Sequence, residues 1–358
     1  MKILQIVGAE FKKGNGITII THELIQELNL HGIKTELLLL TPTDISVNYI
    51  IHQNIHDYDL FFANNKFDLV VFHGLFYYKY YIIAKYLALN NIPYIIKPHS
   101  SLMRASHKKS WLKKKVSFIF FFNKFIKNSS SIIFSNDEER RNSVFFPNKY
   151  FIETNGITLI TEKNTSISSS DNINLLFLSR IDFQHKGIDY LIKGFKEFDS
   201  KTKLSNVKLN IYGTGINKEL VRLNKLIKDT PSIKFFGPIF GEAKDKLLKK
   251  SDILLLTSRY EGFPTILIDV LCKGIPVIIT PGTNATFFEK EGVGWIADLL
   301  PNSIAMTLER AVLDYTNRKQ EIKKRCIIFV HENFDIKKTI NETISIYYEV
   351  INSSSMFH

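Results

Sequence analysis

Cysteine is nearly absent from this sequence. Of the 358 residues, only Cys272 and Cys326 are cysteines, and they form neither a C-x-x-C motif nor a spacing typical of zinc ligands. We therefore expect no disulfide framework and no structural zinc site, and a reducing cytosol is the expected environment.

Long apolar runs are missing as well. No stretch approaches the roughly 18–20 apolar residues that a membrane-spanning helix needs. The first apolar run, KILQIV, is followed by Gly8, Glu10 and two lysines before any small-residue cleavage site, which is typical of a first strand rather than a signal peptide. We expect a protein that is soluble or lies on a membrane surface.

Acidic residues are outnumbered by basic ones. The chain has 35 Asp and Glu against 47 Lys and Arg, a formal net charge of +12. Such an excess favours an anionic partner: nucleic acid, a phosphorylated small molecule or an anionic membrane surface. Charge alone does not choose among these three.

The dinucleotide-binding fingerprint G-x-G-x-x-G is also lacking, because Gly8, Gly14 and Gly16 have the wrong spacing for it. This argues against a dehydrogenase. The segment GNGIT at residues 14–18 follows the first predicted strand. Its two glycines would let the backbone approach a phosphate group or an acceptor closely.

What the sequence does contain is a repeated alternation of strand-like and helix-like segments. KILQIV, TELLLL, FDLVVFHG, PYIIKPH and SIIFS are separated by segments with helical periodicity, and the alternation restarts with INLLFLSRI, VKLNIYG, SIKFFG, DILLLTS and PVIIT. This pattern predicts two α/β domains, each a doubly wound parallel sheet, with binding loops at the carboxyl ends of the strands and a cleft between the domains. The predicted divisions are an N-terminal acceptor-binding domain (1–158), a linker or loop (159–172), a C-terminal domain (173–335) and a C-terminal helix (336–358) that packs back on the first domain.

The segment SRYEGFPTILIDVLCKGIPVIIT, residues 258–280, places two acids around a predicted helix start. Glu261 falls in the loop after a buried strand, and Asp269 falls one turn into the helix. The amides of Thr265, Ile266 and Leu267 are expected to be unpaired donors that bind phosphate. The alternative is that Glu261 is a solvated loop acid and that Asp269 only favours the helix dipole.

A second segment, FLSRIDFQHKGIDYLIKGF, places two basic residues near a strand end. Arg180 follows the first strand of the second domain, and Lys186 precedes the next helix. Both can converge on one anion, and each charge-assisted contact contributes about 1.5–3 kcal/mol. In so basic a chain, two basic residues by themselves are weak support for an anion site. The support is stronger if they lie near the predicted helix start at Thr265.

These segments together resemble the retaining GT-B glycosyltransferases of family 4. EGFPTILIDVLCKGIPVI resembles the E-x7-E segment of that family, and SRIDFQHKG resembles its Arg…Lys diphosphate clamp. NGI at 155–157, IYGTG at 211–215, GTNATFFEKEGVGWIA, VFHGLF and IPYIIKPHSSL match further segments in the same order. The resemblance covers nearly the whole chain.

For the second domain the resemblance implies a nucleotide-sugar site. Arg180 and Lys186 would bind the donor diphosphate, and Glu261 would face the transferred sugar as a catalytic residue. Asp269 stands where the family has a glutamate that holds the ribose, and it is one methylene shorter. Backbone donors after Glu261 would hold phosphate and sugar hydroxyls; they are Gly262, Phe263, Thr265 and Ile266.

For the first domain the resemblance makes His99 a catalytic residue that reaches the cleft near the donor sugar. Ser100 stands where the family has glycine. A lone histidine at a strand end is otherwise more often structural. Gly14 and Gly16 would serve the acceptor or phosphate loop.

A basic and aromatic segment, RASHKKSWLKKKVSFIFFFNKFIKN, contains no acid. Lys and Trp in one helical stretch suit an anionic membrane surface, whereas the alternative is an ordinary core helix with lysines on its solvated face. Nucleic acid is not expected, because no reader motif accompanies the segment. The residues assigned to the membrane surface are Lys108, Lys109, Trp111, Lys113, Lys114 and Lys115.

The expected protein is thus a metal-independent retaining glycosyltransferase without a cofactor. It would move a hexose or N-acetylhexosamine from a nucleoside diphosphate sugar to a lipid-linked or polysaccharide acceptor of a bacterial surface glycan, at the inner face of the cell membrane. Asp57-Tyr58-Asp59 has the D-x-D pattern of metal sites but is interpreted as a solvated turn. The competing hypotheses are a non-catalytic basic binding protein of the same fold and a nucleotide-sugar epimerase.

Overall fold

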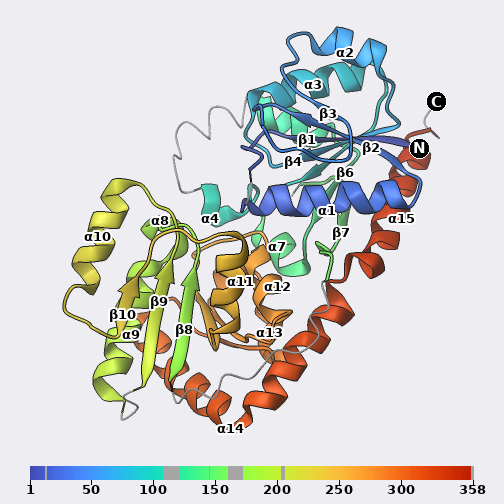
Figure 1. Ribbon diagram of the computed structural model, residues 1–358. Helices are drawn as coiled ribbons and strands as arrows, with labels where there is room; N and C mark the ends of the chain where they lie inside the picture. The colour runs from blue at the N-terminus through green and yellow to red at the C-terminus, as the bar shows by residue number, and fades with distance from the viewer. Residues whose placement is uncertain (13, 108–120, 145, 160–171, 203–205, 356–358) are drawn as a thin grey trace. The chain divides into compact units, whose positions relative to one another are not determined.

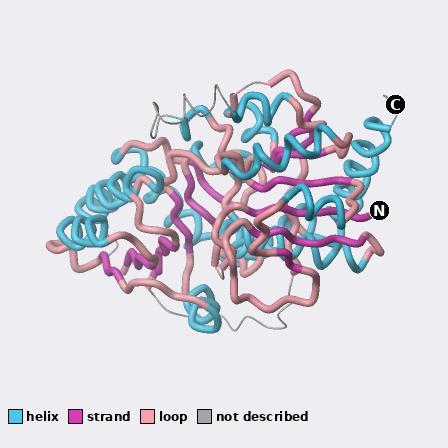
Figure 2. Tube along the Cα trace, turned by 90° about the horizontal axis from the view of Figure 1, so that it is seen from above, coloured by secondary structure: helices cyan, strands magenta, loops and turns pink. Residues whose placement is uncertain are grey.

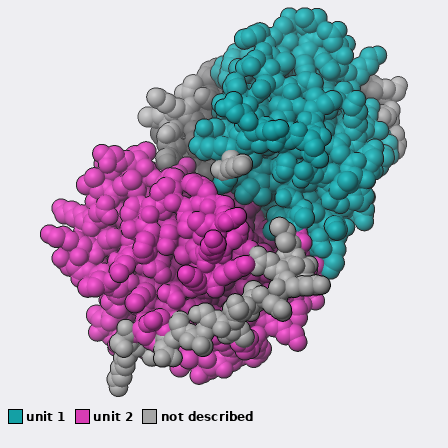
Figure 3. All heavy atoms as spheres, in the orientation of Figure 1, with its two compact units in different colours: residues 1–158, 333–358 teal, residues 159–332 magenta. Residues whose placement is uncertain are grey.

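The computed structural model describes all residues except 13, 108–120, 145, 160–171, 203–205 and 356–358. The chain divides into two compact units (Figures 1 and 3). Unit 1 consists of Met1–Thr158 and Asn333–His358, and unit 2 of Leu159–Glu332.

Unit 1 is built on a parallel sheet of seven described strands in the order β3-β2-β1-β4-β5-β6-β7. Each neighbouring pair is parallel. The strands are β1 (Lys2–Val7), β2 (Lys34–Leu39), β3 (Ile51–His52), β4 (Leu69–His73), β5 (Tyr94–Lys97), β6 (Ser131–Phe134) and β7 (Tyr150–Ile152).

Helices cover both faces of this sheet (Figures 1 and 2). Alternate strand residues point to opposite faces, so Leu4 and Phe72 pack with α2, α3 and α6, whereas Ile3 and Val71 pack with α1 and α15. The described helices are α1 (Gly16–Leu30), α2 (Tyr58–Asn64), α3 (Tyr78–Leu89), α4 (Arg104–His107), α6 (Asn123–Lys127), α7 (Asp137–Asn142) and α15 (Ile336–Ser355).

Helix α15 completes the core of unit 1 although it lies at the other end of the sequence. Ile340, Ile346, Tyr347 and Val350 are buried among residues of β1, β4 and β5. Without them one face of the sheet would expose apolar surface to water, at a cost of about 25 cal/mol per Å².

Unit 2 contains a parallel sheet of six described strands in the order β10-β9-β8-β11-β12-β13. The strands are β8 (Ile173–Leu178), β9 (Val207–Tyr212), β10 (Ile233–Phe235), β11 (Ile253–Leu256), β12 (Val277–Ile279) and β13 (Gly294–Ile296). Its helices are α8 (Phe183–Lys186), α9 (Ile188–Lys201), α10 (Asn217–Ile227), α11 (Gly241–Lys249), α12 (Thr265–Leu271), η2 (Pro281–Thr283), α13 (Phe287–Lys290) and α14 (Pro301–Asn333). Helix α14 is kinked at Arg318, where φ is −125°.

The predicted fold class of two parallel α/β sheets is confirmed. In each sheet the strand order reverses once, between β1 and β4 in unit 1 and between β8 and β11 in unit 2. Ligands of open parallel sheets bind at the carboxyl ends of the strands at such switch points. We therefore expect ligand-binding residues in the loops that follow β1, β4, β8 and β11.

The prediction of a solvated turn at Asp57-Tyr58-Asp59 is wrong. Asp57 is the N-cap of α2, and its carboxylate accepts a hydrogen bond of 2.9 Å from the amide of Leu60. Asp59 lies in the first helical turn, where a negative charge meets the positive end of the helix dipole. A capping role accounts for both acids.

Candidate active site

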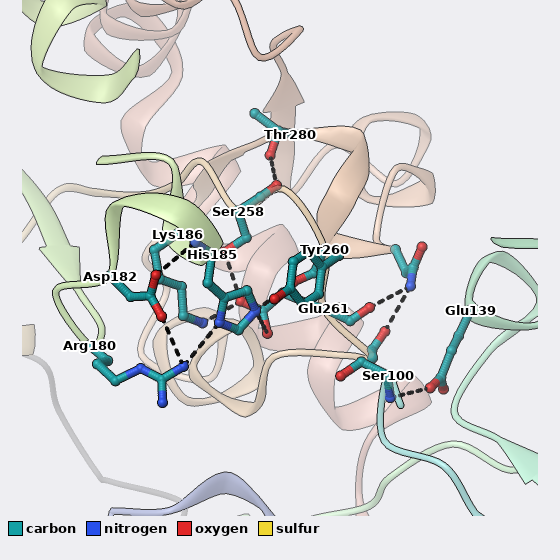
Figure 4. A network of polar contacts seen from close by, with 12 residues as sticks. Ser100, Glu139, Arg180, Asp182, His185, Lys186, Ser258, Tyr260, Glu261 and Thr280 are labelled. Carbon is teal, nitrogen blue, oxygen red and sulfur yellow. Dashed lines mark hydrogen bonds and ion pairs between the residues drawn. The ribbon is translucent and has the colours of Figure 1, made fainter. Parts of the chain in front are cut away.

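The switch point of unit 2 carries the two segments that the sequence singled out. Arg180 lies two residues beyond β8, and Glu261 lies five residues beyond β11. Parallel strands that are neighbours in a sheet bring their carboxyl ends together. β8 and β11 are such neighbours, and the loops after them meet in one polar network (Figure 4).

Glu261 is the centre of this network. Its Oε1 forms an ion pair with Lys186 and accepts a hydrogen bond of 2.7 Å from the hydroxyl of Ser258. The side chains of Glu261 and Lys186 are each only 12% exposed. Burial alone would raise the pKa of Glu261, but the charge of Lys186 and the hydrogen bonds from Lys186 and Ser258 outweigh it, and the pKa is lowered. The carboxylate is therefore ionised at neutral pH.

His185 links Arg180 to the same network. Its Nε2 lies 2.7 Å from the carbonyl oxygen of Tyr260, which can only accept, so Nε2 carries the proton. Its Nδ1 then accepts from the guanidinium of Arg180 at 3.1 Å. Burial, reinforced by the charges of Lys186 and Arg180, lowers the pKa of His185. His185 is thus a neutral residue that orients Arg180, and the sequence analysis gave it no role.

The loop after β11 is fixed from the opposite side by Asn284. This buried residue, at φ 53°, donates from Nδ2 to the carbonyl oxygens of Glu261 and Gly262 at 2.6 and 3.2 Å. Thr280 donates to the carbonyl of Ser258 at 2.7 Å. The segment GTNATFF alone does not reveal this role of Asn284, because its partners lie more than 20 positions away in the chain.

The start of α12 differs in one respect from the prediction. Pro264 is its N-cap, and the amide of Leu267 donates to the Pro264 carbonyl oxygen at 3.0 Å. Leu267 is therefore not a free donor, because the first turn closes on the residue before the helix. Among the described residues the amides of Thr265 and Ile266 donate to no acceptor, and Gly262 and Phe263 are buried beside them.

Asp269 belongs to a separate ion pair. Its carboxylate contacts the ammonium group of Lys244 on α11, a residue that the sequence analysis did not consider. The structure thus brings Arg180, Lys186 and Glu261 into one network and places Asp269 with Lys244 outside it. Asp269 stands where the family has a glutamate, and its carboxylate is paired with Lys244.

In unit 1, His99 follows β5 and is held against His73, the last residue of β4. The Nε2 of His99 lies 2.9 Å from Nδ1 of His73, and the rings are stacked with centroids 5.1 Å apart. Burial, reinforced by the charge of Lys97, lowers the pKa of His99 to about 3. Gly14, at φ 83°, precedes Asn15, the N-cap of α1, which begins at Gly16.

The profile of the glycosyl transferases group 1 family matches residues 172–314, which include this entire network. The domain formed by these residues is a glycosyl transferases group 1 domain. The family predicted from the motifs is confirmed.

Relatives of this chain occur in bacteria and archaea. An uncharacterised glycosyltransferase of Methanocaldococcus jannaschii is 27% identical over 180 residues, which cover 49% of this chain and 45% of that protein, so the match spans about half of its length. An uncharacterised protein in the cps region of Klebsiella pneumoniae is 25% identical over 301 residues, covering 79% of each chain.

Solved structures of the GT-B fold align along almost the whole chain. Sucrose-phosphate synthase from Thermosynechococcus elongatus has a TM-score of 0.76 at 14% identity, covering 99% of this chain and 100% of that one. HepE from Anabaena, in complex with UDP and glucose, has a TM-score of 0.75 at 15% identity, covering 98% and 100%. At these identities the likeness shows the fold.

The residues assigned to the membrane surface lie outside the described residues: Lys108, Lys109, Trp111, Lys113, Lys114 and Lys115. The predicted linker at 159–172 falls almost wholly outside them as well. Among the helices that are described, none is both long and apolar enough to cross a bilayer. In the same part of the chain no three His, Cys, Asp or Glu side chains gather as ligands of a metal ion would.

Proposed function

We propose that this protein is a retaining glycosyltransferase. It moves a hexose or N-acetylhexosamine from a nucleoside diphosphate sugar, with UDP as the nucleotide, to a hydroxyl of a lipid-linked or polysaccharide acceptor. The observation that carries the proposal is the ion pair of Lys186 with Glu261 at the switch point of unit 2, with Arg180 oriented beside it by His185. HepE binds UDP-glucose, which supports the choice of UDP.

In this proposal Lys186, Arg180 and the amides of Thr265 and Ile266 bind the donor diphosphate. An ammonium group has three donor hydrogens, so Lys186 can remain paired with Glu261 and donate to a phosphate oxygen at the same time. Asp269, held by Lys244, would bind the ribose. The basic groups stabilise the negative charge that develops on the leaving diphosphate, which is the task a metal ion performs in other transferases.

The bond that breaks joins the anomeric carbon to the diphosphate oxygen, which keeps the electron pair. The acceptor oxygen bonds to the anomeric carbon on the same face, so the configuration is retained. Its proton passes to the departing phosphate oxygen. Glu261, ionised and adjacent to the sugar, stabilises the positive charge on the anomeric centre, and His99 contacts the sugar from unit 1.

One relative supports a biological setting for this activity. The Klebsiella pneumoniae relative lies in a cps region, which supports a role in bacterial surface polysaccharide assembly, on the cytoplasmic side where nucleotide sugars are made. The products are a lengthened glycan and the nucleoside diphosphate.

Nucleotide binding tests this proposal first. UDP at about 100 times its Kd should stabilise the wild-type protein by about 2.7 kcal/mol, which raises Tm by about 5–11 °C for a unit of this size. GDP, ADP and NAD should give smaller shifts in the same thermal assay. The Arg180→Ala/Lys186→Ala variant should lose the response, because each charge-assisted contact contributes about 1.5–3 kcal/mol.

The control is Lys201→Ala/Arg310→Ala, which removes two basic side chains of unit 2 that are 72% and 56% exposed. It should respond to UDP like the wild type. If the folded wild type responds to no nucleotide, the protein is a non-catalytic binding protein. Conversion of a UDP-sugar to its epimer without acceptor would assign an epimerase.

We also propose that unit 1 binds an anionic membrane surface, where a lipid-linked acceptor would lie. Between Asp68 and Asp137 the sequence has no acidic residue and eleven Lys and Arg. On the described α3 within this stretch, Tyr78 is 57% and Ile82 39% exposed, and Phe121 packs edge-on against the ring of Tyr78 at 5.3 Å. Exposed apolar groups among basic residues are typical of interfacial binding.

The Lys113→Glu/Lys114→Glu/Lys115→Glu variant should lose binding to vesicles of phosphatidylglycerol and phosphatidylcholine in a flotation assay. Each lysine near an anionic surface contributes about 1 kcal/mol, so the apparent affinity should fall by more than about 100-fold. Binding of the wild type should weaken as salt is added. The control is the variant with the same charge change at Lys218 and Lys225 of α10 and at Lys228, its C-cap residue. Equal loss of binding in both variants would refute a specific surface.

A further inference from the structure

A row of buried polar side chains runs through the switch point of unit 1 and ends at His99. It begins at Gln5 on β1 and continues through His73 at the end of β4, and both residues are 0% exposed. Buried polar groups require hydrogen-bond partners, and here the partners are one another together with the hydroxyls of Tyr347 and Thr21, which lie 3.5 Å from Nε2 of Gln5 and 3.4 Å from Nδ1 of His73.

The distances set the direction of each hydrogen bond. Oε1 of Gln5 lies 2.8 Å from Nε2 of His73, and an amide oxygen only accepts, so the proton of His73 is on Nε2. The Nε2 of Gln5, at the other end of the amide, donates to the hydroxyl of Tyr347 at 3.5 Å. Nδ1 of His73 is then an acceptor, and Nε2 of His99, 2.9 Å away, must donate to it.

We propose that Gln5 and His73 are positioning residues that hold His99 in the tautomer protonated at Nε2. The ring then presents Nδ1 as a hydrogen-bond acceptor. The role of His99 toward the sugar rests on the proposed function. In that role Nδ1 of His99 would accept a hydrogen bond from a hydroxyl of the ligand, and His99 would not act as an acid.

Both imidazoles are kept neutral by their surroundings. Burial lowers the pKa of His73 and of His99, and the charge of Lys97 lowers both further. The other titratable groups near Lys97 are Glu153 and Tyr347. Two imidazoles joined by one hydrogen bond cannot both be protonated at the shared position, so one ring donates and the other accepts. The hydrogen bond of His73 to Gln5 decides which ring donates.

The backbone of His99 is held by a second, independent contact. His99 and Ser100 are consecutive non-glycine residues at φ 45° and 70°, a left-handed conformation that costs about 1–2 kcal/mol for each residue. The amide of Ser100 donates to Oε1 of the buried Glu139 at 2.7 Å (Figure 4). Oε2 of Glu139 accepts from the amide and the hydroxyl of Ser135 at 2.9 and 2.6 Å. Backbone and ring of His99 are therefore both fixed, which a merely structural histidine does not require.

The test reads the tautomer directly. Long-range ¹H–¹⁵N correlation spectra of the full chain labelled with ¹⁵N-histidine distinguish protonated from unprotonated ring nitrogens, and His99→Gln assigns the His99 signals. We expect one tautomer for wild-type His99, with the proton on Nε2. Gln5→Glu should preserve it, because a carboxylate also only accepts, whereas Gln5→Leu should give a mixture of tautomers. His52→Gln, which removes another partly buried histidine of unit 1, is the control and should change nothing at His99.

A wild-type His99 with its proton on Nδ1 would show that the Gln5 amide faces the other way and would overturn the proposal. A single unchanged tautomer in folded Gln5→Leu would overturn it too. If Gln5→Leu does not fold, the wild-type and Gln5→Glu spectra still decide. The spectra need no donor, so a failure to bind UDP would count against the proposed function and not against the positioning roles.

Discussion

Glu261→Gln should lower the rate of glycosyl transfer by about 10²–10³-fold, the usual loss when one electrostatic contact to the transition state is removed. The substitution keeps the size of the side chain and an oxygen that can accept from Ser258, but it removes the charge. The carboxylate of Glu261 is paired with Lys186 inside the network, and it is ionised at neutral pH. In the transition state it would face the positive anomeric centre.

The measurement is the initial rate of sugar transfer from the UDP-sugar that gives activity with the wild type, together with the UDP thermal shift. We expect UDP binding to persist in Glu261→Gln, because Lys186 and Arg180 remain, so that kcat falls far more than KM rises. Glu289→Gln is the matched control, since Glu289 is an acid of unit 2 that is 43% exposed and paired with Arg310. A Glu261→Gln rate within tenfold of the wild type would exclude a catalytic role.

The second large effect concerns stability and lies in unit 1. Lys97→Met should destabilise the protein by about 3–5 kcal/mol, because it leaves the carboxylate of Glu153 buried without its counter-ion. Nζ of Lys97 lies 2.5 Å from Oε1 of Glu153, and each side chain is 4% exposed. Oε2 of Glu153 already has no partner among the described residues, so the carboxylate depends on Lys97.

Thermal unfolding checks this expectation, with a decrease in Tm of about 6–20 °C for a unit of this size. Lys97→Met/Glu153→Met should be less destabilised than the sum of its single variants, because no charge remains buried. The control is Lys149→Met: Lys149 also lies 2.5 Å from a glutamate, Glu349 of α15, but the two side chains are 50% and 51% exposed. Exposed pairs contribute about 0–1 kcal/mol, so equal losses in Lys97→Met and Lys149→Met would refute the argument.

The direction of the pH dependence follows from the same pair. Burial alone would lower the pKa of Lys97, but Glu153 and Tyr347 outweigh it and the pKa is raised. A raised folded-state pKa means that the stabilisation is complete below the ordinary lysine range and is lost as the pH rises above it. The wild type should therefore keep this contribution throughout neutral pH.

Much of the polar network in unit 2 could be predicted from sequence because its parts follow strand ends. Glu261 lies in the loop after β11, a strand of four apolar residues. This order in the sequence places it at the carboxyl end of the sheet, independently of the rest of the chain. Arg180 and Lys186 are close to one another in sequence, so the geometry of one strand and one loop brings them near. The error at Leu267 is also local: Pro264 offers its carbonyl to the first helical turn, which the count of free amides did not include.

The residues that were missed have partners far away in the chain. His73 and Gln5 are 68 positions apart, Glu139 and Ser100 are 39 apart, and Lys244 and Asp269 are 25 apart. No periodicity or spacing rule connects such pairs, since they meet only after the strands have taken their order in the sheet.

The sequence by itself determined the two parallel sheets, the family and which strand ends carry charged loops, because strand and helix periods, turn residues and motif order are local properties of the chain. Only the tertiary structure decided which side chains meet. It paired Lys97 with Glu153 against Tyr347 of the last helix, gave His185 and His99 their orienting partners, and joined Asp269 to Lys244. Hydrogen bonds and ion pairs act over a few ångströms, so their existence depends on distances that the sequence alone does not contain.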